Sequence, residues 1–332
     1  MKILLVTDAW QPQVNGVVRT YQNTIKELRA MGHEVEVIHP YLTYLKRKPL
    51  TGYKEIEYVT NPWAIRHMVA HELSMGTHIH IATEGPLGLV ARWTCRKGHF
   101  TTSYHTQFPE FIQKRTRIPA GFFYPYFRWF HKKSAAVLTP TEYMKEYLTN
   151  KGFRRVKVWT RGVDTNVFRH DLRNDPGYYL VCVSRVSQEK GLDDFCQLEH
   201  PRKVLVGDGP YLKTLQKRYP DVKFTGKLEG KELATYYANA DCFVFPSMTD
   251  TFGIVMLESI ACGTPIASYP TAGALEVVEP NINGCLVQGD VKTLQQAVKL
   301  CMDINRWDVI ESSRKWTWKR ATESFLENIY IH

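Results

Sequence analysis

Three kinds of pattern are missing from this sequence of 332 residues, and each absence argues against a class of protein. The seven cysteines are scattered and form no closely spaced pair. Neither a disulfide framework nor a zinc site is therefore expected, and the thiols should be reduced, as in the cytosol. No G-x-G-x-x-G follows the first strand pattern of either half, which disfavours an oxidoreductase with a dinucleotide cofactor. An Asp-x-Asp pair is absent too, so we expect neither a metal ion nor a cofactor.

Long apolar runs are also missing. No stretch approaches the roughly 20 residues that a membrane-spanning helix needs. The opening segment, MKILLVTDAW, is apolar only as far as Asp8, which is too short for a signal peptide, so we expect a buried first strand. Short-period repeats and low-complexity tracts are absent as well. These features indicate a globular cytoplasmic protein that is long enough for two domains.

The net charge of +10 is distributed unevenly along the chain. Residues 1–165 hold 24 Lys and Arg against 12 Asp and Glu, whereas residues 166–332 hold 19 against 21. The positive excess therefore belongs to the first half. It indicates an anionic partner, either a nucleic acid or a membrane surface.

Apolar segments of strand length alternate with helical patterns, which is typical of parallel sheets. We expect strands at residues 2–8, 33–40, 78–83, 100–106, 134–141, 178–185, 203–209, 222–226, 242–247 and 265–269. We expect helices at residues 16–32, 85–98, 210–220, 231–240 and 252–262. The predicted fold class is α/β, with two Rossmann-like αβα domains at 1–165 and 166–315 facing each other across a deep cleft. An amphipathic helix at 316–332 is expected to pack back on the first domain.

Three short motifs follow predicted strands and are candidates for a ligand site. In DAWQPQVNGVV, Asn15 and Gly16 precede a helix whose N-terminal N–H groups suit a phosphate, although spacing alone favours a plain turn. In SRVSQEKG, Arg185 and Lys190 could hold a diphosphate, or they could be two solvated cations. In PSMTDTFGIVMLES, Asp250 and Glu258 could accept hydrogen bonds from sugar or ribose hydroxyls. The alternative for this last pair is a helix N-cap and a surface acid.

Together these motifs resemble the retaining glycosyltransferases of family 4, which have the GT-B fold. DTFGIVMLES is similar to the family's acid-x7-acid signature, with Asp250 where Glu is more frequent, and SRVSQEKG resembles its donor-phosphate motif. NGVV and VGDGP match two further stretches. Four segments, WQPQVNGVVRT, ATEGPLG, SYHTQFPEF and RGVDTNVF, are similar to a branch of sulfoquinovosyl-, glucosyl- and mannosyltransferases that build glycolipids.

The resemblance implies a role for each matching residue. Arg185 and Lys190 would hold the donor diphosphate and stabilise the charge of the leaving group, in place of a metal. The donor would also be bound by Asp250, Thr251, Phe252 and Gly253 at the sugar's hydroxyls and by Glu258 at the ribose. Gly16 would let the loop of the first domain close over the phosphates. His105 would lie near the transferred sugar and share in catalysis, although a strand-end histidine bonded to the backbone is the alternative. Glu84 would orient the acceptor or cap the helix that begins at Pro86.

Residues 113–133, QKRTRIPAGFFYPYFRWFHKK, interleave Lys and Arg with seven aromatic residues. Such a composition suits a segment that enters the headgroups of an anionic membrane. The predicted membrane and acceptor residues are Lys114, Arg115, Arg117, Phe122, Phe123 and Trp129, with Lys46, Arg47 and Lys48 as further cations. Core packing of the aromatics is the alternative. Single-stranded nucleic acid is disfavoured because no nucleic-acid-binding motif accompanies the segment.

From the resemblance we expect a metal-independent, anomer-retaining hexosyltransferase at the cytoplasmic face of the membrane. Its donor would be a nucleoside-diphosphate sugar, with a UDP-sugar favoured, and its acceptor a lipid such as diacylglycerol. The alternative is the same chemistry on a soluble or polysaccharide acceptor, for example by a GDP-mannose-dependent mannosyltransferase. A non-catalytic binder of nucleotide sugars is disfavoured because Arg185, Lys190, Asp250 and Glu258 are all present.

Overall fold

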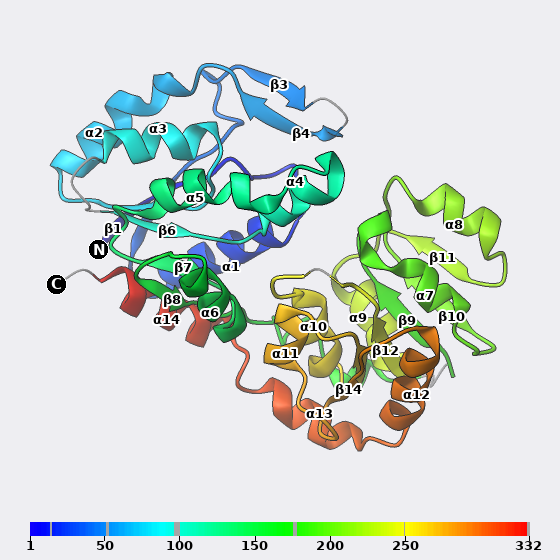
Figure 1. The fold of residues 1–332 in the computed structure, drawn as a ribbon. Helices are drawn as coiled ribbons and strands as arrows, with labels where there is room; N and C mark the ends of the chain where they lie inside the picture. Colours follow the sequence, from blue (N-terminus) through cyan, green and yellow to red (C-terminus); the bar gives the residue numbers. More distant parts are fainter. Residues whose placement is uncertain (14, 51–52, 96–99, 175–177, 249, 331–332) are drawn as a thin grey trace. The chain divides into compact units, whose positions relative to one another are not determined.

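The chain forms two compact units in the structure, which is a computed structural model (Figure 1). It describes residues 1–13, 15–50, 53–95, 100–174, 178–248 and 250–330, without the side chains of residues 50, 53–56, 111, 114 and 115. The first unit comprises residues 1–160 together with 321–332, and the second comprises residues 161–320. Each unit is described by itself.

A six-stranded parallel sheet with the order β2-β1-β5-β6-β7-β8 is the centre of the first unit. Its strands are β1 (Lys2–Val6), β2 (Glu34–Ile38), β5 (His78–Ile81), β6 (Phe100–Ser103), β7 (Val137–Thr139) and β8 (Val156–Val158). An antiparallel hairpin of β3 (Arg47–Leu50) and β4 (Tyr53–Val59) follows β2. The helices are α1 (Gly16–Ala30), η1 (Pro62–Ile65), α2 (Arg66–Ser74), α3 (Pro86–Thr94), α4 (Phe108–Thr116), η2 (Ala120–Phe122), α5 (Tyr124–His131) and α6 (Glu142–Asn150).

Alternation along β1 shows that both faces of this sheet are buried. Leu4 and Val6 belong to a core with residues of η1, α2, α3 and α5, whereas Ile3 and Leu5 belong to a core with residues of α1. That second core also contains Phe325 and Ile329 of the C-terminal helix α14 (Trp318–Ile329). Figure 1 shows α2, α3 and α5 along one side of the sheet. Both faces are thus covered, and β5 and β6 also carry buried polar side chains, among them His80 and Ser103.

The second unit has a parallel sheet with the order β11-β10-β9-β12-β13-β14. Its strands are β9 (Leu180–Val183), β10 (Lys203–Val206), β11 (Lys223–Gly226), β12 (Cys242–Phe245), β13 (Ile266–Ser268) and β14 (Gly284–Leu286). Its helices are η3 (His170–Leu172), η4 (Gln188–Lys190), α7 (Leu192–Gln197), α8 (Leu212–Arg218), α9 (Gly230–Asn239), α10 (Ile254–Ala261), α11 (Ala272–Val277), α12 (Val291–Met302) and α13 (Arg306–Ser313). The strand order changes direction between β9 and β12, where ligands bind in such sheets.

The predicted α/β class and the parallel sheets are confirmed. The structure differs from the sequence pattern at residues 113–133, which lie in α4, η2 and α5 and the turns between them. Tyr124, Phe127 and Phe130 recur at intervals of three and are buried, so for these three aromatics core packing is the correct alternative. Phe122 is 76% exposed and Trp129 is 38% exposed. The segment therefore combines a core face with an outer face.

Candidate functional site

The motifs SRVSQEKG and PSMTDTFGIVMLES lie at the same edge of the second sheet. The first follows β9 and the second follows β12, and these two strands are neighbours. Lys190 Nζ donates to Asp250 Oδ2 over 2.7 Å, and the two side chains are 19% and 20% exposed. The structure thus brings together a cation and an acid that are 60 residues apart in the chain.

Gly191 makes the close approach of these two loops possible. Its φ is +63°, and a Cβ there would lie 2.4 Å from the carbonyl oxygen of Pro246. A side chain at this position would therefore push the Lys190 loop away from the end of β12. Arg185 takes a different partner, since its guanidinium donates to Glu189 Oε1 over 2.6 Å and its side chain is 46% exposed. The arrangement gives one half-buried ion pair and one solvated ion pair beside the β9–β12 edge.

Helix α11 packs against the loop that follows Asp250. A Cβ on Gly273 would lie 1.7 Å from the carbonyl oxygen of Phe252, so α11 packs directly on the backbone of this loop. The ring of Phe252 is 4% exposed and contacts Trp316 with a centroid separation of 5.9 Å. Thr251 is half-buried, and Gly253 is the N-cap residue of α10. The loop backbone is thus fixed by packing.

Glu258 lies within α10 and is only 3% exposed. The hydroxyl of Tyr237 donates to its Oε2 over 3.2 Å. The alternative of a surface acid for Glu258 is therefore wrong, because a buried carboxylate with a tyrosine partner occupies the position. The N-cap alternative for Asp250 is wrong as well, since Gly253 holds that place.

In the first unit, Asn15 caps α1, and its side chain accepts a hydrogen bond from the N–H of Val18 over 3.0 Å. Gly16 is the first residue of the helix. A Cβ on Gly16 would meet nothing within 4 Å in the described part of the chain. The N-terminus of this 15-residue helix lies at the carboxyl end of β1, where the sequence pattern placed it.

Asp8 has a structural role that the sequence did not predict. Its carboxylate accepts hydrogen bonds from the N–H groups of Leu87 and Gly88, at the start of α3, and from the hydroxyl of Thr83. Burial is the largest influence on this carboxyl and raises its pKa to about 6. The signal was a lone acid directly after an apolar strand, but its partners lie almost 80 residues away.

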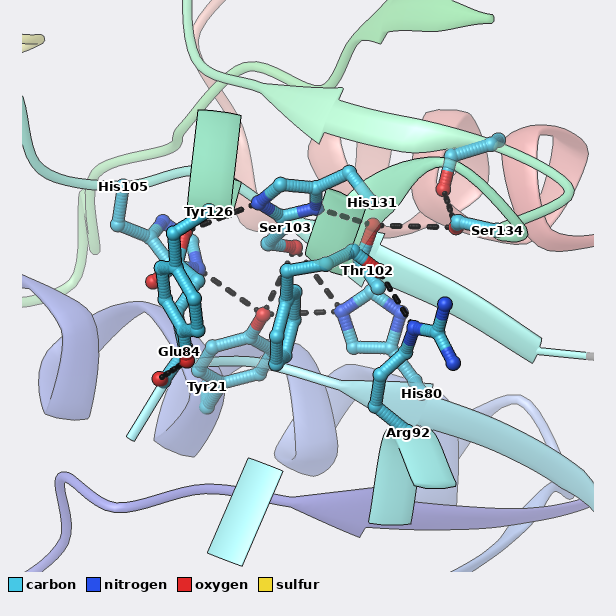
Figure 2. A network of polar contacts seen from close by, with 12 residues as sticks. Tyr21, His80, Glu84, Arg92, Thr102, Ser103, His105, Tyr126, His131 and Ser134 are labelled. Carbon is cyan, nitrogen blue, oxygen red and sulfur yellow. Dashed lines mark hydrogen bonds and ion pairs between the residues drawn. The ribbon is translucent and has the colours of Figure 1, made fainter. Parts of the chain in front are cut away.

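Glu84 and His131 are paired inside the first unit (Figure 2). Oε1 of Glu84 lies 3.2 Å from Nε2 of His131, and the two side chains are 5% and 2% exposed. On the other side of the ring, Nδ1 of His131 lies 2.8 Å from Thr102 Oγ1, which donates to Ser134 Oγ over 3.0 Å. Glu84 therefore does not cap α3, because Asp8 satisfies the first N–H groups of that helix. Its acceptor role stays a prediction.

His105 follows β6 and is half-buried. Its Nε2 lies 2.9 Å from the hydroxyl oxygen of Tyr21, which projects from α1 (Figure 2). The alternative for His105 was a bond to a backbone group, whereas the contact seen here is with a side chain. Asp8, Glu84 and His105 follow β1, β5 and β6, three neighbouring strands of the sheet.

The predicted membrane residues lie on α4, η2 and α5. Phe122 and Trp129 are exposed, Phe123 is half-buried, and Arg117 is exposed at the end of α4. The side chains of Lys114 and Arg115 lie outside the described residues. Trp129 contacts Trp93 of α3, which is 46% exposed, with a centroid separation of 6.1 Å. The guanidinium of Arg92 lies 4.6 Å from the ring centroid of Trp129.

The residues that the structure describes contain no group of three or more His, Cys, Asp and Glu side chains that could hold a metal ion. Within the same part of the chain, every helix is too short or too polar to cross a membrane.

The chain matches two sequence families that together cover most of its length. One is described as "Glycosyltransferase Family 4" and matches residues 14–167, and the other is "Glycosyl transferases group 1" and matches residues 177–303. The two segments correspond to the greater part of the first and second units.

Individual proteins are similar to the chain over almost its whole length. A GDP-mannose-dependent alpha-mannosyltransferase of Corynebacterium glutamicum is 28% identical, over 99% of this chain and 88% of the relative. An alpha-monoglucosyldiacylglycerol synthase of Streptococcus pneumoniae is 25% identical, over 99% and 86%. A protein of Anabaena, solved in complex with UDP and glucose, superposes with a TM-score of 0.72 at 20% identity over 98% of both chains. That last likeness concerns the fold.

The raised pKa of Asp8 predicts a pH-dependent stability. The folded carboxyl keeps its proton up to about pH 6, whereas an unfolded one releases it near pH 3.8. The unfolding free energy of the unaltered protein minus that of Asp8→Asn should therefore fall by about 1–3 kcal/mol between pH 4.5 and pH 7. Urea unfolding followed by circular dichroism measures it. The exposed Asp303→Asn variant is the control, and a difference that stays constant for Asp8→Asn would contradict the prediction.

Proposed function

The chain belongs to the family 4 glycosyltransferases of GT-B fold, and on this premise we propose that it makes a glycolipid. It would transfer a hexose or hexuronic acid from a nucleoside-diphosphate sugar, with a UDP-sugar favoured, to a lipid acceptor such as diacylglycerol. The transfer would take place at the cytoplasmic face of the membrane and would retain the anomeric configuration. The observation that carries the donor assignment is the ion pair of Lys190 and Asp250 at the β9–β12 edge.

The Lys190–Asp250 pair supports a diphosphate-sugar site because both charges are half-buried and each could exchange its partner for a group of the donor. A bound diphosphate would compete for Lys190 and for Arg185, whose guanidinium forms a solvated pair with Glu189. Asp250 would then be released to accept hydrogen bonds from the sugar's hydroxyls. Glu258, with Tyr237 already on one oxygen, is proposed to accept from the ribose.

The reaction breaks the bond between the sugar's anomeric carbon and the diphosphate oxygen and forms a bond from that carbon to the acceptor hydroxyl oxygen. In a retaining reaction both events occur on the same face of the sugar. The hydroxyl proton passes to the departing diphosphate, so charge and atoms balance. Lys190 and Arg185 would stabilise the negative charge that develops on the leaving group, a type of electrostatic contribution that is often the largest in catalysis.

The acceptor assignment rests on the outer surface of the first unit. Exposed apolar side chains lie on three elements of one core, Trp63 on η1, Trp93 on α3, and Tyr126 and Trp129 on α5. Phe122 lies on η2, directly before α5. Lys132 and Lys133 are exposed directly after α5. Aromatic residues flanked by cations suit the headgroup region of an anionic membrane. A lipid acceptor is reached most directly by an enzyme bound there.

A second candidate keeps the chemistry and changes both substrates. In it, GDP-mannose is the donor and a soluble or polysaccharide acceptor replaces the lipid. The relative from Corynebacterium glutamicum favours it, because its name states GDP-mannose as the donor. Its acceptor is not stated in that name, so the two candidates are separated by measurement.

The first prediction for the function concerns donor and metal. We expect release of a nucleoside diphosphate from a UDP-sugar in the presence of vesicles that contain diacylglycerol, and we expect it to persist in EDTA. UDP-glucose, UDP-sulfoquinovose and GDP-mannose are compared, and NMR of the product reports the anomeric configuration. Transfer from GDP-mannose alone to a soluble acceptor would select the second candidate. Loss of activity in EDTA with recovery in Mn²⁺ or Mg²⁺, or an inverted product, would contradict the proposal.

The second prediction concerns Lys190. Lys190→Ala, like Arg185→Ala, should lower kcat/KM for the donor by about 10²–10³-fold, the usual effect of removing one group that stabilises transition-state charge. Lys227→Ala is the matched control, because this lysine follows β11 of the same sheet and forms a solvated pair with Glu229 over 2.8 Å. Unchanged kcat/KM in Lys190→Ala and Arg185→Ala would remove both cations from the mechanism.

The third prediction concerns the membrane. The triple variant Arg117→Ser, Lys132→Ser, Lys133→Ser should bind phosphatidylglycerol vesicles more weakly, with a smaller dependence on salt, because exposed charges are screened within about 8–10 Å at physiological ionic strength. Phe122→Ser should weaken the part of the binding that survives high salt. Co-sedimentation at low and high salt measures both effects.

A matched control for Phe122→Ser is Trp307→Ser, which removes a 66% exposed aromatic from the second unit and should leave vesicle binding unchanged. Donor hydrolysis without lipid should be unchanged in all these variants. Equal binding of the unaltered protein to neutral and anionic vesicles, or to neither, would contradict the lipid assignment.

A further inference from the structure

The hydroxyl of Tyr21 is the meeting point of three polar side chains inside the first unit (Figure 2). Its oxygen lies 2.9 Å from Nε2 of His105, 2.9 Å from Nε2 of His80 and 2.9 Å from Oγ of Ser103. A phenol has one hydrogen to donate and two lone pairs to accept. The three contacts therefore match the one hydrogen and the two lone pairs of the hydroxyl.

Most of this network lies in the core. Tyr21 is 1% exposed, His80 is 0% and Ser103 is 1%, whereas His105 is half-buried at the end of β6. Burying polar groups costs free energy even when they are paired, and apolar side chains would fill the same space without that cost. His105 is the most exposed member of this group. The network therefore connects the core with the sheet edge at which His105 lies.

A second layer fixes the imidazole of His80. Its Nδ1 lies 2.8 Å from Thr101 Oγ1, and the same oxygen lies 2.8 Å from Nε2 of His78. Burial holds the pKa of His80 well below its usual range and lowers that of His78 to about 4. Both rings are therefore neutral near pH 7, and a neutral ring carries one hydrogen, whose place its partners determine.

Aromatic rings fix the position of the network. His105 and Tyr21 meet edge to face with a centroid separation of 5.3 Å, and Trp159 packs against both at 5.9 Å and 5.4 Å. Phe325 of α14 closes the other side, at 4.8 Å from Trp159 and 5.0 Å from His80. The His105 ring is thus held by packing as well as by its hydrogen bond.

We propose that Tyr21 is a positioning residue that fixes the orientation and the tautomer of His105. With the hydrogen of Tyr21 on Ser103 Oγ, the phenol oxygen accepts the Nε2–H of His105. Nε2 of His80 lies 2.9 Å from both the phenol oxygen and Ser103 Oγ, so its hydrogen is shared between them. His105 then carries its hydrogen on Nε2, and Nδ1 is its basic nitrogen. The catalytic consequence rests on the proposed function, in which His105 serves the transferred sugar; the hydrogen bond itself does not.

The test combines nitrogen NMR with kinetics. In the unaltered protein, ¹⁵N shifts should show His105 with its hydrogen on Nε2, and the signal is assigned by its loss in His105→Gln. Tyr21→Phe should shift His105 toward a mixture of tautomers. In the same variant kcat for sugar transfer should fall about tenfold, as expected for the loss of one hydrogen bond that orders a catalytic group, with KM for the donor changed less than twofold.

Tyr104→Phe is the matched control. Tyr104 directly precedes His105 and is 0% exposed, and its hydroxyl makes no hydrogen bond to Tyr21, His80, Ser103 or His105. Removing this hydroxyl should therefore leave both the His105 spectrum and kcat unchanged. Equal losses of kcat in the two variants would overturn the proposal, because they would show a general effect of removing a hydroxyl from this core.

Three other results would overturn it as well. These are a hydrogen on Nδ1 of His105 in the unaltered protein, an unchanged His105 spectrum in Tyr21→Phe, and an altered spectrum with unchanged kcat. The first needs no variant and decides the assignment even if Tyr21→Phe fails to fold. If the unaltered protein transfers no sugar from any donor, the proposed function fails, and the NMR measurement still decides the hydrogen bond.

Discussion

Both parallel sheets are buried on their two faces, so the ends of the strands are where polar side chains can meet a ligand. Lys190 and Asp250 follow β9 and β12, the pair between which the strand order changes direction. In the first unit, Asp8, Glu84 and His105 follow three adjacent strands. The predicted site residues that follow these strands thus lie at one edge of each sheet, because the apolar faces are closed to charged groups.

Two acids that follow strands of the first unit are paired inside the protein. Asp8 neutralises the N-terminus of α3, and Glu84 is paired with His131. The contacts of these two carboxylates are therefore made within the fold of the first unit. Lys190 and Asp250 are different, because they pair with each other and about a fifth of each side chain remains exposed. A pair of this kind can be opened by a competing anion at low cost, whereas the buried Glu84–His131 pair would leave an uncompensated group.

Sequence patterns predicted the strands that precede the site, because a buried parallel strand is a short apolar run ended by Gly, Pro or a polar residue. Arg185, Lys190, Asp250 and Glu258 could be selected by their places after such runs. The burial of Glu258 could not, since its position in α10 depends on Tyr237 of α9. The segment 113–133 was described by composition alone. Its division into core and surface follows the helical period of α5, which two prolines and an excess of aromatics obscured.

No local sequence pattern could predict the contacts between residues that are distant in the chain. Tyr21 and His80 are 59 residues apart, and Tyr21 and His105 are 84 apart. In the sequence Tyr21 is one more member of the buried stripe of α1, together with Val18, Ile25 and Leu28, and nothing distinguishes its hydroxyl from an apolar end. Only when β5 and β6 are placed side by side do His80 and Ser103 come within reach of that hydroxyl. Because the helix supplies the phenol and the sheet supplies the imidazoles, the orientation of His105 depends on how α1 packs on the sheet.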